Sequence, residues 1–232
     1  MTNRFSDAFL SEAERHAAWG AEQLHVLGSF LPGGPWTAEL SSCTYQQGGL
    51  ELRVAVLGTY DRDERSWMWG WANPGWRGEE VVALTEAVER YGRAHGIPEL
   101  AAEVVDLAGF DDPDRAAEML AFTGMGVVGA PGYLGQMAGP GTRVYFLPDD
   151  PRVPRAALEP VALPRVLLTG AGLIGHSAPQ VVRGFFEHHG VPYRTEDGGG
   201  RIVAELPDGN AVEVGFDGLG RISGVGVDRI SR

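Results

Sequence analysis

The chain has 232 residues and a formal net charge of −12, from 31 acidic and 19 basic residues. Because a surface with this charge repels polyanions over long distances, we expect no nucleic-acid partner. Hydrophobic residues make up 44% of the chain and charged residues 22%, which is typical of a folded globular protein and excludes a disordered one.

All basic residues are arginines, and this excludes several mechanisms. Without lysine the chain has no phosphate-binding Gly-Lys-Ser/Thr loop, no Schiff-base lysine and no kinase-type lysine. The single cysteine, Cys43, forms no internal disulfide and fits a small buried thiol better than a nucleophile. We therefore expect no cofactor and no metal centre.

The beginning of the chain predicts a cytoplasmic protein. Residues 1–7 lack the apolar core of a signal peptide, and no stretch approaches the roughly 18 apolar residues that cross a bilayer. A lone cysteine also fits a reducing compartment. We expect neither secretion nor membrane insertion.

The first 148 residues alternate between helical and strand-like hydrophobic periods, which predicts an α+β domain with an antiparallel sheet and packed helices. The expected elements, in chain order, are a helix over 5–27, strands over 36–40, 50–56 and 67–71, a helix over 79–95, a strand over 102–107, a helix over 111–123, and strands over 127–137 and 143–147.

A second domain is predicted after a proline-rich segment. Five prolines lie between Pro148 and Pro164, so residues 149–164 are expected to be a semi-rigid linker between a domain over 1–148 and a module over 165–232. The module has a helical pattern from Ser177 to Gly190, and strands are expected over 201–206, 211–216 and 221–227. It is predicted to be a small αβββ module.

The most distinctive segment is Ser66–Pro74, which carries three tryptophans in alternation. In a strand, Trp67, Trp69 and Trp71 share one face, and the slim residues Met68, Gly70 and Ala72 share the other. The indoles are either part of the core or, with Asn73, a stacking surface for a ligand or partner. The slim face is expected to lie under a closely packed element.

A glycine motif, Gly170–Gly175, fits the dinucleotide-binding fingerprint and follows the strand-like residues 165–169. Glu196 and Asp197 lie about 20 residues further on, where a ribose-binding carboxylate belongs. The next helix, however, is expected to begin at Ser177, several residues too late for its amides to meet a pyrophosphate. We interpret the motif as a glycine-rich connection.

His188 and His189 are candidate acid/base or ligand-binding residues, with Asp197 nearby in the sequence. Adjacent residues on a helix point about 100° apart, so the two imidazoles do not easily bind one metal ion. The alternative is that the pair stabilises a helix C-terminus through the helix dipole.

The segment Leu57–Asp61, the motif Trp67–Pro74 and the helix ending Tyr91-Gly92 together resemble an uncharacterised bacterial family with a Trp-x-Trp-x-Trp-x-Asn signature. The resemblance covers roughly Phe5 to Pro148 and implies a shared fold and a bacterial origin. It transfers no catalytic residue. The C-terminal module resembles small helix-plus-meander modules of bacterial chaperone-like and toxin-immunity proteins.

These observations favour a non-catalytic protein of accessory, chaperone-like or immunity type that binds a protein partner or a ligand. A small-molecule enzyme with a site between the domains is the alternative, with His188, His189 or Asp197 as acid/base groups. Nucleotide binding at Gly170–Gly175 is a third hypothesis.

Overall fold

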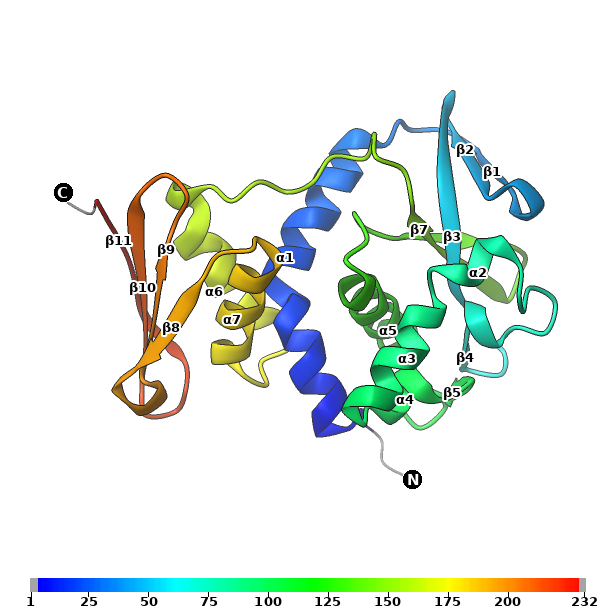
Figure 1. The fold of residues 1–232 in the computed structure, drawn as a ribbon. Coiled ribbons are helices and arrows are strands. Elements are labelled where there is room, and N and C mark those ends of the chain that lie inside the picture. Colours follow the sequence, from blue (N-terminus) through cyan, green and yellow to red (C-terminus); the bar gives the residue numbers. More distant parts are fainter. Residues whose placement is uncertain (1–3, 230–232) are drawn as a thin grey trace. The chain divides into compact units, whose positions relative to one another are not determined.

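The computed structural model describes residues 4–229, and contacts divide the chain into two compact units (Figure 1). The first unit contains Gln23–Arg155 together with the residues up to Phe9, and the second contains Leu10–Glu22 together with the residues from Ala156 onward. Helix α1 (Asp7–Phe30) therefore contributes residues to both units. Helices and antiparallel sheets occur in both, and the predicted α+β class is confirmed.

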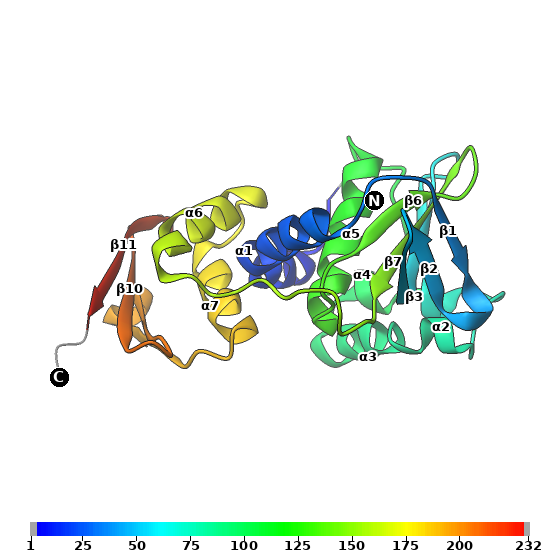
Figure 2. The ribbon, with the colours of Figure 1, turned by 90° about the horizontal axis from the view of Figure 1, so that it is seen from above.

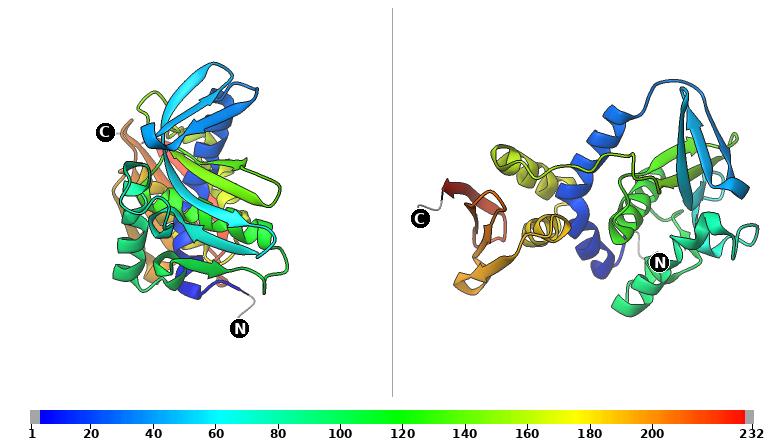
Figure 3. Two further views of the ribbon diagram at one scale, coloured as in Figure 1. Left: turned by 90° about the vertical axis from the view of Figure 1, so that its right-hand side faces the viewer. Right: turned by 45° about the horizontal axis from the view of Figure 1, so that its top comes forward.

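The first unit is built on a seven-stranded antiparallel sheet, with the hydrogen-bonded order β1-β2-β3-β4-β5 and β7 pairing with β3 and β6. Its strands are β1 (Trp36–Glu39), β2 (Thr44–Gln47), β3 (Leu50–Asp61), β4 (Ser66–Trp69), β5 (Val104–Asp106), β6 (Leu134–Met137) and β7 (Thr142–Pro148). A bulge between Val56 and Gly58 interrupts the pairing of β3 with β7. Because β3 continues beyond this bulge, it joins β2 at one end to β4 at the other (Figure 3).

Three short helices and one of 16 residues belong to the described part of the first unit, and most of them lie beside the sheet (Figure 2). They are α2 (Glu80–Ala83), α3 (Glu86–His95), α4 (Pro98–Ala101) and α5 (Pro113–Val128). Asp112 caps α5, since its Oδ1 accepts a hydrogen bond from the Arg115 amide at 2.9 Å. The predicted helix over 79–95 is thus divided between α2 and α3, and Val127 and Val128 end α5 where a strand was expected.

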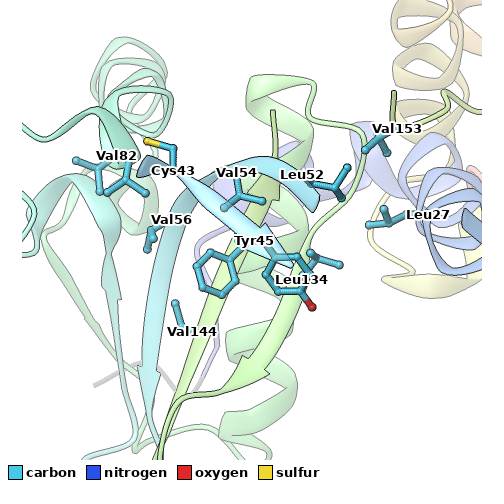
Figure 4. Close-up of a cluster of buried hydrophobic side chains, with 12 residues drawn as sticks. Leu27, Cys43, Tyr45, Leu52, Val54, Val56, Val82, Leu134, Val144 and Val153 are labelled. Atoms are coloured by element: carbon cyan, nitrogen blue, oxygen red, sulfur yellow. The ribbon is translucent and has the colours of Figure 1, made fainter. Parts of the chain in front are cut away.

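A cluster of buried side chains from β2, β3, β6 and β7 forms part of the core of this unit (Figure 4). Tyr45, Leu52 and Val56 are each at most 1% exposed. Cys43 is also buried, as expected, but it lies after a short 3-10 turn with a left-handed backbone (φ 55°) and not within a strand. Burying apolar area of this kind stabilises the sheet by about 25 cal/mol per Å².

The tryptophan segment is shorter as a strand than predicted. Strand β4 ends at Trp69, and Gly70–Ala72 form a 3-10 turn, so Trp71 does not share a strand face with Trp67 and Trp69. The close packing expected at Gly70 is confirmed, because a Cβ atom there would lie 2.2 Å from the carbonyl oxygen of Val56. Ala72 is buried as well, whereas Met68 stays half-buried.

The second unit is a four-stranded antiparallel meander, covered on one face by two helices (Figures 1 and 2). Its elements are α6 (Leu163–Leu173), α7 (Ala178–His188), β8 (Tyr193–Glu196), β9 (Arg201–Glu205), β10 (Asn210–Phe216) and β11 (Ile222–Arg229). The prediction of an αβββ module therefore missed two elements that the structure contains, helix α6 and strand β8. The segment from Asp149 to Glu159 contains neither a helix nor a strand.

Candidate functional site

The tryptophans of the first unit are buried among other side chains. Trp67 and Trp69 have no exposed surface, and Trp71 is 7% exposed. The indole Nε1 of Trp69 donates to the carbonyl oxygen of Glu99 at 2.9 Å, and a Cβ atom at Gly124 would lie 2.9 Å from its ring. With their faces covered in this way, the indoles contribute to the core and offer no stacking surface to a ligand.

Asn73 follows the tryptophans at the end of the 3-10 turn. Its Oδ1 accepts a hydrogen bond from the Gly75 amide at 2.9 Å, and its carbonyl oxygen accepts from the amides of Trp76 and Arg77. An asparagine that bonds to the backbone two residues ahead stabilises a turn. The geometry therefore gives Asn73 a role in the connection between β4 and α2.

The first unit also contains a polar cluster around Glu118 of α5. This carboxylate accepts hydrogen bonds from the hydroxyls of Tyr133 and Tyr145 at 2.7 and 2.9 Å and from Arg143 at 2.8 Å. Burial, together with the Glu118 charge, raises the pKa of both tyrosines. The cluster links α5 to β7, and each of its partners is hydrogen-bonded, as polar groups inside a fold require.

In the second unit the glycine motif Gly170–Gly175 lies largely within a helix. Residues 165–169 belong to α6 and not to a strand, and the helix continues to Leu173, which leaves only Ile174–Ser177 as a connection. A Cβ atom at Gly170 would lie 2.6 Å from Cα of Ala18, so this glycine allows α6 to approach α1 closely. The strand–turn–helix context of a dinucleotide site is absent from this segment.

His188 meets a second histidine that the sequence did not single out. Its Nε2 lies 2.8 Å from Nδ1 of His16 in α1, within hydrogen-bonding distance, and its ring stacks on Trp19 with centroids 3.9 Å apart and planes 5° apart. Glu12 Oε1 lies 3.0 Å from His16 Nε2, at an angle that gives an electrostatic contact but no hydrogen bond. A carboxylate and two imidazoles thus form a row.

The electrostatics of this row favour a neutral imidazole at His188. Burial first, and then the neighbouring His16, His189 and Arg15, together lower the pKa of His188 to about 3, against the opposing effect of Glu12. A hydrogen bond between two ring nitrogens needs one donor and one acceptor, so a neutral imidazole on at least one side suits it. The row links α1 to α7 inside the second unit.

The other two candidates do not join this row. His189 packs against Phe185 with ring centroids 4.6 Å apart, and burial lowers its pKa. Asp197 lies beyond β8, where its carboxylate pairs with Arg201 at 2.7 Å. Among residues 4–229 no group of three or more His, Cys, Asp or Glu side chains is placed to hold a metal ion.

A buried carboxylate stabilises the start of α7. Glu14 has no exposed surface, and its Oε1 accepts a hydrogen bond from the amide of His176 at 2.5 Å. The side chain of Ser177, at the N-cap position, makes no capping hydrogen bond, so Glu14 from α1 serves the unpaired amides there. Burial nevertheless raises the pKa of Glu14, against the opposing effect of the backbone amides at the start of α7, and its second oxygen has no hydrogen-bond partner.

The surface of the second unit carries an apolar groove of about 540 Å³, which we call the α6–β11 groove. Its walls are α6, the connection to α7, the start of α7 and the turn into β11. Leu168 and Leu219 line it and are 53% and 77% exposed, and Ile222 lies beside them. The one arginine in its wall, Arg221, is neutralised by Asp217 at 2.7 Å. Large exposed apolar side chains gathered in one hollow are typical of a binding surface.

A comparison with protein families finds one whose model matches residues 4–151, described as a family of unknown function, DUF6882. The chain belongs to the DUF6882 family. The match covers nearly all of the first unit together with α1, and the α6–β11 groove lies outside it. No curated protein and no solved structure matches the chain. In residues 4–229 no helix is long and apolar enough to cross a membrane.

Sequence reasoning missed the residues that the second unit brings together. The sequence predicted the first helix from its apolar residues alone. Its polar positions Glu12, Glu14 and His16 belong to no recognisable motif, so they were not singled out. A signal did exist for the groove, because Leu219 is a large apolar residue in the otherwise polar turn Asp217–Gly220. A leucine in such a turn has little core to enter, which leaves it on the surface.

Proposed function

We propose that this protein is a non-catalytic binding protein that holds an apolar segment of a partner in the α6–β11 groove. The observation that carries the proposal is the exposure of Leu168 and Leu219 in one hollow of about 540 Å³. Leaving such side chains in water is unfavourable, and covering them contributes about 25 cal/mol for each Å² of apolar surface removed from water. A role of accessory, chaperone-like or immunity type fits a protein that works through such a surface.

The negative net charge of the chain favours a basic partner. A net charge of −12 attracts basic proteins over long distances and repels acidic ones, which speeds encounter with the former. The groove itself is close to neutral, because Arg221 is paired with Asp217. We therefore expect apolar side chains of the partner to supply most of the affinity, and its basic side chains to supply the rate of association.

The test is binding of the intact protein to an array of immobilised 12-residue peptides that vary in apolar pattern and charge. The proposal predicts a set of bound peptides and a loss of at least fivefold in affinity in Leu219→Gln. The matched control is Val161→Gln, since Val161 is 97% exposed and does not line the groove. An array without selective binding, or an equal loss in both variants, overturns the proposal.

A small-molecule enzyme is the second candidate, and the row Glu12–His16–His188 favours it. An imidazole beside a carboxylate is the arrangement that general bases use, and a base works best with a pKa near the operating pH. The burial that lowers the pKa of His188 to about 3 opposes this use. Titration of the His188 ring by NMR decides between the two: a pKa between 6 and 7 supports the enzyme, and one near 3 supports a structural pair.

A further inference from the structure

The outermost strand of the second unit has an open edge. The strand order is β11-β10-β9-β8, and among the described residues β11 pairs only with β10. An edge strand presents a row of unpaired amide and carbonyl groups, which can accept a further strand unless charges, proline or a short length prevent it. At eight residues, β11 is long enough to do so.

The two edges of this sheet differ in how they are protected. The outer face of β8 carries Arg194 and Glu196, which pair with each other at 2.7 Å. In β11 the corresponding face carries Gly224, Gly226 and a single charged residue, Asp228, and no Cβ covers the backbone at the two glycines. Glycine is otherwise a costly residue inside a strand and is typical of a place where another backbone approaches closely.

The inner face of β11 is apolar and incompletely covered. Val225 pairs with Val214 and Val227 pairs with Val212, so all four share the face that packs toward the helices. Val212 and Val214 are fully buried, whereas Val225 and Val227 stay half-exposed. Figure 3 shows the two helices on this face of the sheet only, and α6 reaches β11.

The groove and the open edge therefore form one continuous surface. Ile222 begins β11 and also lines the α6–β11 groove together with Leu168. A strand added beside β11 would place every second side chain on the same face as Val225 and Val227, toward the apolar surface of α6. The backbone ladder would supply affinity and the groove would supply preference for apolar residues.

The outer face indicates the charge of the added strand. Glu205, Ala211 and Asp228 stand in register across three strands, so both carboxylates lie on the outer face. Neither has an ion-pair partner among the side chains of residues 4–228. The residue of an added strand opposite Asp228 would share this row, and opposite charges on directly paired strands stabilise the pair. A second copy of the chain would bring another Asp228 and another net charge of −12, which disfavours self-pairing.

We infer that the partner binds as an added β-strand along β11, in an extended segment that alternates apolar residues with polar ones and carries arginine or lysine opposite Asp228. This inference rests on the proposed function and names the conformation and chemistry of the partner. It predicts that the peptides bound by the array alternate in hydrophobicity with a period of two. Bound peptides with apolar residues at i, i+3, i+4 and i+7 would retain the proposed function and overturn strand addition, because that pattern is helical.

The decisive experiment uses one 12-residue probe, a synthetic peptide of alternating valine and threonine with arginine at a central polar position. Two further peptides carry N-methyl groups on the odd-numbered or the even-numbered amides. Only every second amide of an added strand bonds to its neighbour, so one methylated peptide should lose at least tenfold in affinity and the other should bind as before. Equal affinities for both, or equal losses in both, overturn the proposal.

The charge of the partner is tested in the same assay. In Asp228→Asn the affinity for the arginine peptide should fall about twofold to fivefold, while a peptide with glutamine at that position should be unaffected. A loss for both peptides, or for neither, contradicts the assignment of the basic residue. Sedimentation of the protein alone provides the control for self-pairing: a monomer is expected, and a dimer that the arginine peptide dissociates would mean that β11 pairs with a second copy.

Discussion

His188 shows how the surroundings of one side chain determine its chemistry. Its ring lies against His16 and the indole of Trp19, and its charged form is disfavoured by His16, His189 and Arg15 and favoured by Glu12. Burial is the largest effect against the charged imidazole, these three neighbours add to it, and one carboxylate does not offset them. The residue that the sequence offered as an acid/base group is therefore held neutral and contributes to packing between α1 and α7.

The lowered pKa of His188 predicts that this residue makes the stability of the protein depend on pH. In the unfolded chain the ring takes up a proton near pH 6.5, and in the folded protein only near pH 3. Between these values the unfolded state binds more protons, so the free energy of unfolding falls as the pH falls, by at most about 1.4 kcal/mol per pH unit.

The measurement is urea unfolding of the wild type and of His188→Gln from pH 7.5 to pH 4. The stability of the wild type relative to the variant should decrease as the pH falls below 6.5. Taking the difference removes the opposite contribution of Glu14, whose raised pKa makes the folded state bind the extra proton. A difference that does not change with pH would show that His188 titrates normally in the folded protein.

At the scale of elements, α6 is the clearest difference between prediction and structure. Residues 165–169 are strand-like in sequence, because short apolar runs fit buried strands and helices equally well. The residues that are buried in α6, Leu163, Val166, Leu167 and Gly170, follow the helical spacing i, i+3, i+4 and i+7. Pro164 in the first turn agrees with a helix. The helical period was therefore present, but the glycines that follow obscured it.

A pair of glycines in α6 tests this packing. Gly170→Ala should destabilise the protein by about 1 to 3 kcal/mol, because the new Cβ would lie 2.6 Å from the backbone of Ala18. Gly172→Ala is the matched control, two residues further along the same helix with no atom within 4 Å of the new Cβ. It should be neutral or stabilise by up to about 1 kcal/mol, since alanine favours helix over glycine.

Thermal or urea unfolding of the two variants beside the wild type measures both effects. Equal stability of Gly170→Ala and Gly172→Ala would mean that α6 does not approach α1 as the structure shows. A large loss in Gly172→Ala alone would indicate a turn at this position, as the glycine motif first suggested.

On the scale of the whole molecule, composition and periodicity predicted the α+β class, and with it most strands of both sheets. The strand β8 was missed because Tyr193–Glu196 carry two charges in four residues and show little apolar alternation. Alternation in the sequence shows which tryptophans share a strand face, but it does not show what covers that face. The sequence therefore could not decide whether the tryptophans belong to the core or to a ligand-binding surface. Burial of Trp67 and Trp69 decides for the core.

The candidate binding surface was the least predictable feature. It combines residues of α6, of the turn between β10 and β11, and of β11 itself. Only the fold brings these segments together. Exposure of Leu219 at 77% and the bare glycines of β11 are properties of the folded surface. The acidic net charge of the chain was evident from the sequence alone, and it is complementary to the basic residue expected in the partner.

Hydrogen exchange of the β11 amides, followed residue by residue by NMR in the intact protein, shows whether a partner adds a strand to β11. Within the described part of the chain, every second amide of this strand points away from β10 and has no strand partner, so in the free protein those amides should exchange rapidly and the ones bonded to β10 slowly. Adding the arginine peptide should slow the exchange of the unpaired set by at least tenfold. Protection of every β11 amide in the free protein, or unchanged exchange in the presence of bound peptide, would contradict strand addition at this edge.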